Sequence, residues 1–266
     1  AVTSGIRNNF FGAESGESLT TGDDNIAIGY QALTSETQGN RTVAIGGNAL
    51  DAQNSTTDTN MYNVGVGYAA GGAVNTGQYN TLIGGLAGDA LTSSNNNVAI
   101  GYQALSTDTQ GTKTVAVGVD ALLNQNFTTN TDSFNVAMGY HAGRDVTTGT
   151  ENTLIGALSG DAITTGSTNT LVGYLSGSAI STGGANTAVG RKAMEATTTS
   201  SDSVAVGSNA LRVNTTGGSN TAVGSAALEA NTTASNNTAV GRSALAANTT
   251  GTNNVSVGYQ AALSNT

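Results

Sequence analysis

The sequence predicts an all-β protein, a parallel β-solenoid (left-handed β-roll) of about fifteen coils, and three observations predict it. A motif ending in glycine recurs fifteen times along the 266 residues, at steps of 17 residues in twelve cases and 21 in two. Each position of the motif keeps its own residue type, as expected for a repeat architecture. The chain lacks Pro and is dense in Gly, Asn and β-branched residues, which disfavours helix and favours short strands between turns. We call the last residue of the motif the corner glycine: Gly12, Gly29, Gly46, Gly67, Gly84, Gly101, Gly118, Gly139, Gly156, Gly173, Gly190, Gly207, Gly224, Gly241 and Gly258.

The residues next to the corner glycine predict a thin interior. Position −1, directly before it, is apolar in all fifteen copies, from Phe11 and Ile28 to Val257. We expect this column to stack as a continuous interior row. Position +3 is always Ala or Ser, so we expect the interior to be narrow there. The glycine itself suits a sharp corner that needs φ > 0 or a close backbone approach.

Position −4 predicts a ladder of polar side chains. It holds Asn in twelve copies and Thr42, Thr114 or Ser203 in the others. Identical Asn side chains that stack once per coil can hydrogen-bond along the axis. We therefore expect an Asn ladder through the array.

In nearly every copy one aliphatic residue stands either at position +4 or at position +7, and not at both. Six copies have Gly at +4 and an aliphatic residue at +7, as in Gly88 with Leu91. The other nine have Leu, Met or Ala at +4 and a polar residue at +7, as in Leu211 with Asn214. Conservation of volume in a packed core would produce this exchange, so we expect one shared cavity per coil, filled from either position. A disordered tract has no reason to keep such a pattern, and the sequence predicts a folded array.

The whole chain is predicted to be a single repeat array. Two four-coil blocks match each other at an offset of 72 residues, and each contains one 21-residue coil. With coils ~4.8 Å apart along the axis, the array predicts a rod of roughly 70 Å. The predicted organisation is one array over 1–266, with a degenerate first coil at 8–24, duplicated blocks at 25–96 and 97–168, and regular coils at 169–266.

Composition excludes several functions. The net charge is −9, and the eight Lys and Arg are scattered, whereas nucleic-acid binding needs clustered cations. No apolar run approaches the roughly 20 residues of a membrane helix, so we expect no membrane insertion. His141 is the only histidine, and there is no cysteine. We expect no enzyme activity, no cofactor and no metal, and an extracellular location.

The thin interior predicted for one chain indicates that several copies of the chain associate. Each coil is expected to bury about two aliphatic residues and one Ala. Each buried aliphatic contributes ~1.5–3 kcal/mol to folding, whereas ordering the backbone costs ~1–2 kcal/mol per residue, so a lone chain is expected to be only marginally stable. Position −2, which is Ala in most copies but Leu82, Leu154 and Leu171 in three, is the expected chain-to-chain face. We expect a homotrimer, with a monomer as the alternative.

The motif strings carry a family resemblance. TVAIG at 42–46, NVAIG at 97–101 and SVAVG at 203–207 resemble the head repeats of YadA-like trimeric autotransporter adhesins. The longer form NTAVGxxAL followed by NTTGxxN, in 220–254, resembles repeats of bacteriophage tail-fibre proteins. The resemblance implies a trimeric left-handed β-roll that presents or binds receptors. The repeat is longer here than the usual adhesin head repeat.

Three groups of residues are candidate sites. The lengthened coils place Met61, Tyr62, Phe127 and Phe134 in otherwise polar loops, which suits a glycan or protein receptor; alternatively these side chains cap the widened coil. Tyrosines that follow six corner glycines are expected to be exposed. Near the start, acidic residues at Asp23–Asp24 and at Glu14 and Glu17 suit either a surface Ca²⁺ or, as we expect, a solvated acidic surface.

These features lead to a hypothesis of function. We expect a structural and adhesive fibre segment: a rigid extracellular shaft or receptor-binding head of a viral tail fibre or a trimeric surface adhesin. A self-assembling extracellular surface filament is one alternative, because an open solenoid end exposes unpaired strand edges. An ice-binding β-solenoid is another, but it needs a Thr-x-Thr rank on one flat face of every coil, and Thr-Thr occurs only in some coils.

Overall fold

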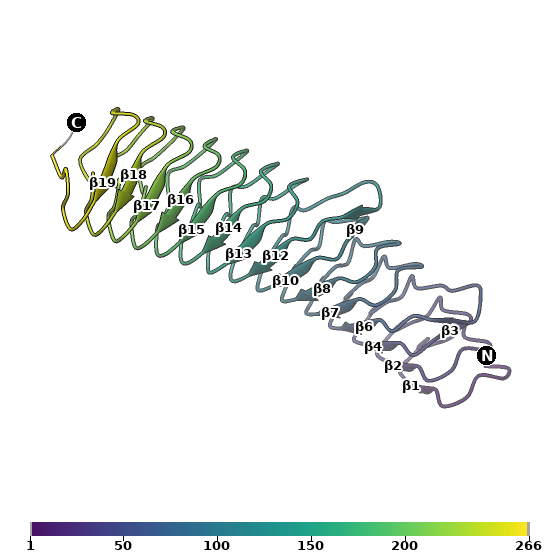
Figure 1. The fold of residues 1–266 in the computed structure, drawn as a ribbon. Helices are drawn as coiled ribbons and strands as arrows, with labels where there is room; N and C mark the ends of the chain where they lie inside the picture. Colours follow the sequence, from purple (N-terminus) through teal and green to yellow (C-terminus); the bar gives the residue numbers. More distant parts are fainter. Residues whose placement is uncertain (1, 265–266) are drawn as a thin grey trace. The chain divides into compact units, whose positions relative to one another are not determined.

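The computed structural model describes residues 2–264 and shows a parallel β-solenoid of about fifteen turns (Figure 1). The described residues contain no helix. Each turn contributes one three-residue strand, because only the three residues before the corner glycine are extended and unbroken by turns. The strands of the main sheet are β1 (Asn9–Phe11), β2 (Ile26–Ile28), β4 (Val43–Ile45), β6 (Val64–Val66), β7 (Thr81–Ile83), β8 (Val98–Ile100), β10 (Val115–Val117), β12 (Val136–Met138), β13 (Thr153–Ile155), β14 (Thr170–Val172), β15 (Thr187–Val189), β16 (Val204–Val206), β17 (Thr221–Val223), β18 (Thr238–Val240) and β19 (Val255–Val257).

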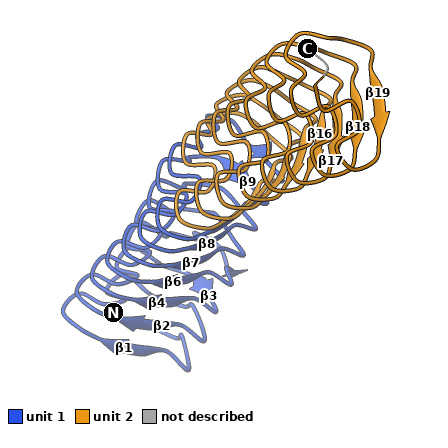
Figure 2. Ribbon diagram, turned by 90° about the vertical axis from the view of Figure 1, so that its left-hand side faces the viewer, with its two compact units in different colours: residues 1–134 blue, residues 135–266 orange. Residues whose placement is uncertain are grey.

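The chain forms two compact units (Figure 2): unit 1 is Ala1–Phe134 and unit 2 is Asn135–Thr266. In unit 1 the strand order is β1-β2-β4-β6-β7-β8-β10, and in unit 2 it runs from β12 to β19 in chain order. Neighbouring strands pair in parallel and join equivalent positions, such as Ala27 with Ala44 and Ala188 with Ala205. In-register pairing is what stacks each position of the repeat into a column.

The two 21-residue coils carry extra strands, both in unit 1. Strand β3 (Gly39–Asn40) pairs with β5 (Thr59–Asn60), and β9 (Gly111–Thr112) pairs with β11 (Thr131–Asp132). Each pair joins the coil before the insertion to the lengthened coil. The lengthened segments are therefore ordered, and we call each a ledge: residues 54–62 and residues 126–134.

The structure corrects the predicted interior at positions −1 and −2. The side chains at −1 lie outside, as Ile28, Ile155 and Val223 do, and those at −2 lie inside. Leu82 and Leu171, predicted to face a neighbouring chain, are fully buried within their own coil. The reason is alternation, because successive side chains of a strand point to opposite faces. With Asn at −4 inside, −2 is inside as well, and −3 and −1 are outside.

The predicted exchange between +4 and +7 is confirmed. The aliphatic residue is fully buried whichever position supplies it, as at Leu211 and at Leu91. A Cβ added to Gly88 would lie 2.9 Å from Leu91 Cδ1, and one added to Gly160 would lie 2.8 Å from Ile163 Cδ1. The two positions compete for one space.

The corner glycines are required for two reasons, their positive φ and the close approach of the next coil. Gly29 has φ +131°, and a Cβ there would lie 2.5 Å from the carbonyl oxygen of Gly46 in the next coil. The repeat also bends at +4, where even Leu33 has φ 55°. Such a conformation strains a non-glycine residue, so burial of the leucine side chain has to offset that strain.

The predicted Asn ladder is confirmed, and its main links run from side chain to backbone. Asn80 N donates to Asn63 Oδ1 (2.9 Å), and Asn97 N donates to Asn80 Oδ1 (3.0 Å). Asn80 Nδ2 also donates to the carbonyl of Ser94 (2.8 Å). Each of these side chains therefore joins its own coil to the next, and its buried amide is hydrogen-bonded.

Candidate functional site

The outer face of the main strands is apolar. It is formed by positions −3 and −1 of each coil, and we call it the outer strand face. Position −1 is always Ile, Val, Met or Phe, and position −3 is Ile, Val or Thr in every copy but the first. The side chains of Ile155, Val189 and Val206 are each 37–38% exposed although their coil neighbours flank them. Position −3 is Thr in six coils, so the continuous apolar column is the one at −1. Large exposed apolar patches are typical of interaction sites.

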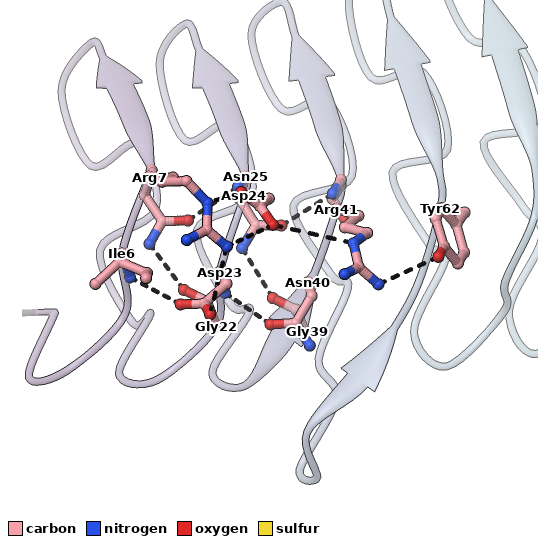
Figure 3. A network of polar contacts seen from close by, with 12 residues as sticks. Ile6, Arg7, Gly22, Asp23, Asp24, Asn25, Gly39, Asn40, Arg41 and Tyr62 are labelled. Atoms are coloured by element: carbon pink, nitrogen blue, oxygen red, sulfur yellow. Dashed lines mark hydrogen bonds and ion pairs between the residues drawn. The ribbon is translucent and has the colours of Figure 1, made fainter.

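A polar groove lies in unit 1 beside the first lengthened coil (Figure 3). Its volume is about 320 Å³. Because four successive coils bring nearby positions of the repeat together, residues 17 or 18 apart in sequence meet in it. Its lining is almost wholly polar: Arg7, Asp23, Asp24, Asn40, Arg41, Asp58 and Asn60.

The groove side chains hold one another in place. Arg7 binds both carboxylate oxygens of Asp24, with Nη2 at 2.9 Å from Oδ2. Asn40 accepts from the backbone N of Asp23 (2.7 Å) and donates to Asp58 Oδ1 (2.6 Å). The hydrogen bond from Arg7, with the attraction of its charge, lowers the pKa of Asp24. The groove is thus a fixed set of donors and acceptors.

An aromatic pair continues this edge of unit 1. Arg41 Nη1 donates to the hydroxyl of Tyr62 (3.2 Å), and its guanidinium lies 5.6 Å from the Tyr62 ring centroid. Tyr62 stacks on Tyr79, with ring centroids 5.6 Å apart. Arg41, Tyr62 and Tyr79 all occupy position −5, where φ is 52–60°. Figure 3 shows Arg41 between Asp24 and Tyr62.

The second lengthened coil repeats the arrangement. Lys113 Nζ lies 5.2 Å from the Phe134 ring centroid and 2.6 Å from Asp132 Oδ2. Thr112 Oγ1 donates to the other oxygen of Asp132 (2.7 Å). The hydrogen bond from Lys113 is the main reason that the pKa of Asp132 is lowered. Lys113 and Phe134 stand 72 residues after Arg41 and Tyr62.

The four predicted contact residues separate into two kinds. Met61 and Phe127 are buried, so their side chains pack beneath the ledges and are not presented at the surface. Tyr62 and Phe134 are 45% and 51% exposed. Sequence reasoning missed the cation beside each exposed ring. The signal was present, because each cation stands 21 residues before its aromatic residue, which is the length of the enlarged coil.

Each ledge is anchored by a fully buried carboxylate at position +7. Glu36 Oε1 accepts from the backbone N of Gly39 (2.7 Å) and of Ser55 (3.0 Å). Asp108 Oδ1 accepts from the backbone N of Gly111 (2.9 Å) and of Phe127 (3.0 Å). Burial raises the pKa of the Asp108 carboxyl, with its hydrogen bonds acting in the opposite direction.

The tyrosines and acidic residues that the sequence predicts to be at the surface lie in separate places. All six tyrosines that follow a corner glycine are exposed. Asp23 and Asp24 line the groove, whereas Glu14 and Glu17 lie elsewhere in the first coil. Among residues 2–264, no three His, Cys, Asp or Glu side chains are grouped so as to hold a metal ion. The described chain also has no helix long and apolar enough to cross a membrane.

Unit 2 has a different exposed column at position +9. Threonine fills it in every coil from Thr148 to Thr250, seven times at a spacing of 17 residues. All seven side chains are exposed. The residue at +11 varies between Thr, Ser and Gly. Unit 2 therefore presents one unbroken column of hydroxyl and methyl groups, with an irregular column beside it.

Comparisons with known proteins identify no relative. The chain matches no protein-family model, no curated protein and no solved structure. Function must therefore be inferred from the surfaces described above.

Proposed function

We propose that the chain is a structural and adhesive fibre segment: a homotrimer of left-handed parallel β-rolls that acts outside the cell, in a viral tail fibre or a trimeric surface adhesin. The proposal assigns it no catalysis. One observation carries it: an apolar residue at −1 in every coil lies on an exposed strand face. An isolated thin coil leaves this face in water, and a second copy of the chain would cover it.

Repetition makes this face an efficient interface. Each newly buried aliphatic side chain contributes up to ~1.5–3 kcal/mol, and the contribution recurs in each coil that makes the contact. In a parallel assembly of identical coils, equal spacing keeps every rung in register with its partner. The resemblance of the motif strings to trimeric repeats favours three copies over two.

Sedimentation equilibrium tests the assembly. We expect a species of three times the 26.2 kDa chain mass. A triple variant that places Lys on the outer strand face of three successive coils should shift the mass to that of one chain, because three buried ammonium groups per protomer cannot be paired. The variant is Val189→Lys, Val206→Lys and Val223→Lys.

A matched control separates interface loss from a general effect of charge. It places Lys at the exposed +9 column of three coils of the same unit, by Thr199→Lys, Thr216→Lys and Thr233→Lys, and should remain trimeric. A wild-type mass of one chain would refute the trimer. Large open-ended species would favour the surface filament instead.

The +9 column of unit 2 supports a second candidate, ice binding. Seven exposed threonines repeat at the coil spacing of about 4.8 Å. The +11 column is Thr in only two of the seven coils, Thr150 and Thr252, so the paired rank is incomplete. Thermal hysteresis of the purified protein at millimolar concentration would support this candidate, and its absence would end it.

A further inference from the structure

We propose that the two lengthened coils of unit 1 are two copies of one binding site for a neutral glycan. We call each copy a ledge site: the first comprises Arg41, Thr57, Thr59 and Tyr62, and the second comprises Lys113, Thr129, Thr131 and Phe134. The inference rests on the proposed adhesive function and names its ligand class and residues.

The two copies keep the same exposed chemistry although their loops have diverged. In each, a cation lies beside a half-exposed aromatic ring, at 5.6 Å for Arg41 and 5.2 Å for Lys113. In each, two threonines stand two residues apart on the ledge, with hydroxyls 2.9 Å apart in the first copy and 3.5 Å in the second. Among the buried ledge positions, Phe127 replaces Ser55, whereas Gln53 and its equivalent are both Gln. The cation, the aromatic ring and the threonine pair are the retained groups that a ligand would touch.

The ledges are rigid enough to hold a ligand. Glu36 and Asp108 each fix the base of a ledge through backbone N–H groups of two coils. Strand pairs β3–β5 and β9–β11 fix the outer part. Groups that are already in place lose little conformational entropy on binding, which favours affinity.

The lining selects a hydroxyl-rich, uncharged ligand. The groove beside the first ledge offers carboxylate, amide and guanidinium groups, and sugar hydroxyls can donate to the first and accept from the last. An apolar ligand would displace water from these polar groups without replacing its hydrogen bonds. A polyanion would be repelled by unit 1, which carries eleven acidic and three basic residues. A cation would compete with Arg7, which already holds both oxygens of Asp24. The exposed rim of Tyr62 adds an amphipathic contact.

The spacing of the copies favours a polymer. Both lie in unit 1 in equivalent columns, four coils apart, which corresponds to roughly 19 Å along the axis. A chain of sugars that reaches both ledges would bind with higher avidity than a short oligosaccharide bound to one. Each chain thus carries two equivalent contacts for one extended glycan.

Binding to immobilised neutral polysaccharides tests the proposal. The probes are mannan, dextran and galactan, with heparin as the anionic comparison, measured by biolayer interferometry on the wild-type protein. We expect at least one neutral polymer to bind and heparin to bind more weakly. The double variant Tyr62→Ala with Phe134→Ala should lose at least tenfold in affinity for that polymer. Each single variant should lose less, and a short oligosaccharide of the same sugar should lose little with either single change.

Tyr259→Ala is the matched control. Tyr259 is an exposed aromatic residue with a cation, Arg242, at 5.7 Å from its ring, but it lies on a regular coil of unit 2. This variant should bind the polymer like the wild-type protein. Failure of all neutral probes, unchanged affinity of the double variant, or an equal loss in the control would overturn the ledge sites. Sedimentation of the same samples keeps the two proposals apart, since a trimer that binds no glycan refutes only this inference.

Discussion

Units 1 and 2 are built from the same repeat and differ in what they add to it. Unit 1 has a net charge of −8, both lengthened coils, and two buried carboxylates at +7. Unit 2 has five basic and six acidic residues, only 17-residue coils, and Asn at +7 in three consecutive coils. The comparison shows which features the coil requires and which are additions. The corner glycine, the Asn ladder and the shared cavity persist in both units, whereas ledges and surface charge occur in one.

Replacing a corner glycine should have the largest effect and should be equal in the two units. Gly190→Ala in unit 2 puts a Cβ 2.6 Å from the Gly207 carbonyl oxygen, and Gly101→Ala in unit 1 puts one 2.4 Å from that of Gly118. Strain at φ near +137° and the clash together should cost about 4 kcal/mol. Chemical denaturation of each variant measures the loss. Tolerance in unit 1 alone would show that its coils are held differently.

Emptying the shared cavity should have the next largest effect. Leu211→Gly should destabilise unit 2 by about 3 kcal/mol, because a buried aliphatic side chain is lost. Adding Asn214→Ile should restore much of the loss, since this pair then matches Gly177 with Ile180. A double-mutant cycle in urea measures the coupling. Additive losses would contradict the shared cavity.

The shared cavity was predictable from the sequence, whereas the facing of the strand was not. The exchange at +4 and +7 keeps volume constant, and a pattern over fifteen copies reveals it without coordinates. The constant apolar character of position −1 suggests burial, but alternation from the buried Asn at −4 places this position outside. Invariance at −1 instead fits a surface that must match another surface in every coil.

The candidate site was predictable only in part, for a related reason. The lengthened coils identified the ledges, and aromatic residues identified Tyr62 and Phe134. Whether a side chain points into or out of a ledge depends on a local bend. Met61 and Phe127 point in, and this depends on how the four-residue insertion beside each of them bends, which no repeat pattern shows. Arg41 and Lys113 come from the preceding coil, so only the stacking of coils brings them to the rings.

Replacing a buried Asn at +7 in unit 2 by Asp, which resembles the buried carboxylates of unit 1, should have a moderate effect on stability. Asn214 Nδ2 donates to the carbonyl of Gly217 (2.9 Å) inside unit 2. Asn214→Asp would place a buried carboxylate against that carbonyl and should cost about 2 kcal/mol at neutral pH. The loss should shrink on acidification, because a protonated carboxyl can donate the same hydrogen bond. A pH-independent loss, measured by urea denaturation at pH 4 and pH 7, would show that shape and not charge is responsible.

The reverse change in unit 1 should have the smallest effect and the opposite sign. Burial raises the pKa of Asp108, so the folded protein binds its proton more tightly than the unfolded chain does. The stability that the protonated group contributes is therefore fully present below the unfolded pKa and is lost as pH rises through the folded pKa. Asp108→Asn removes this loss and should stabilise unit 1 by about 1 kcal/mol at neutral pH, since the amide oxygen can still accept from Gly111 N. The advantage should vanish as pH falls below the unfolded pKa. Gln125 Nε2 donates to the other oxygen, Asp108 Oδ2 (2.7 Å), and an amide N–H group placed there could not accept this bond. A variant that is less stable at every pH would therefore mean that the ledge needs the second carboxylate oxygen, and that unit 1 keeps its buried charge to hold the ledge in place.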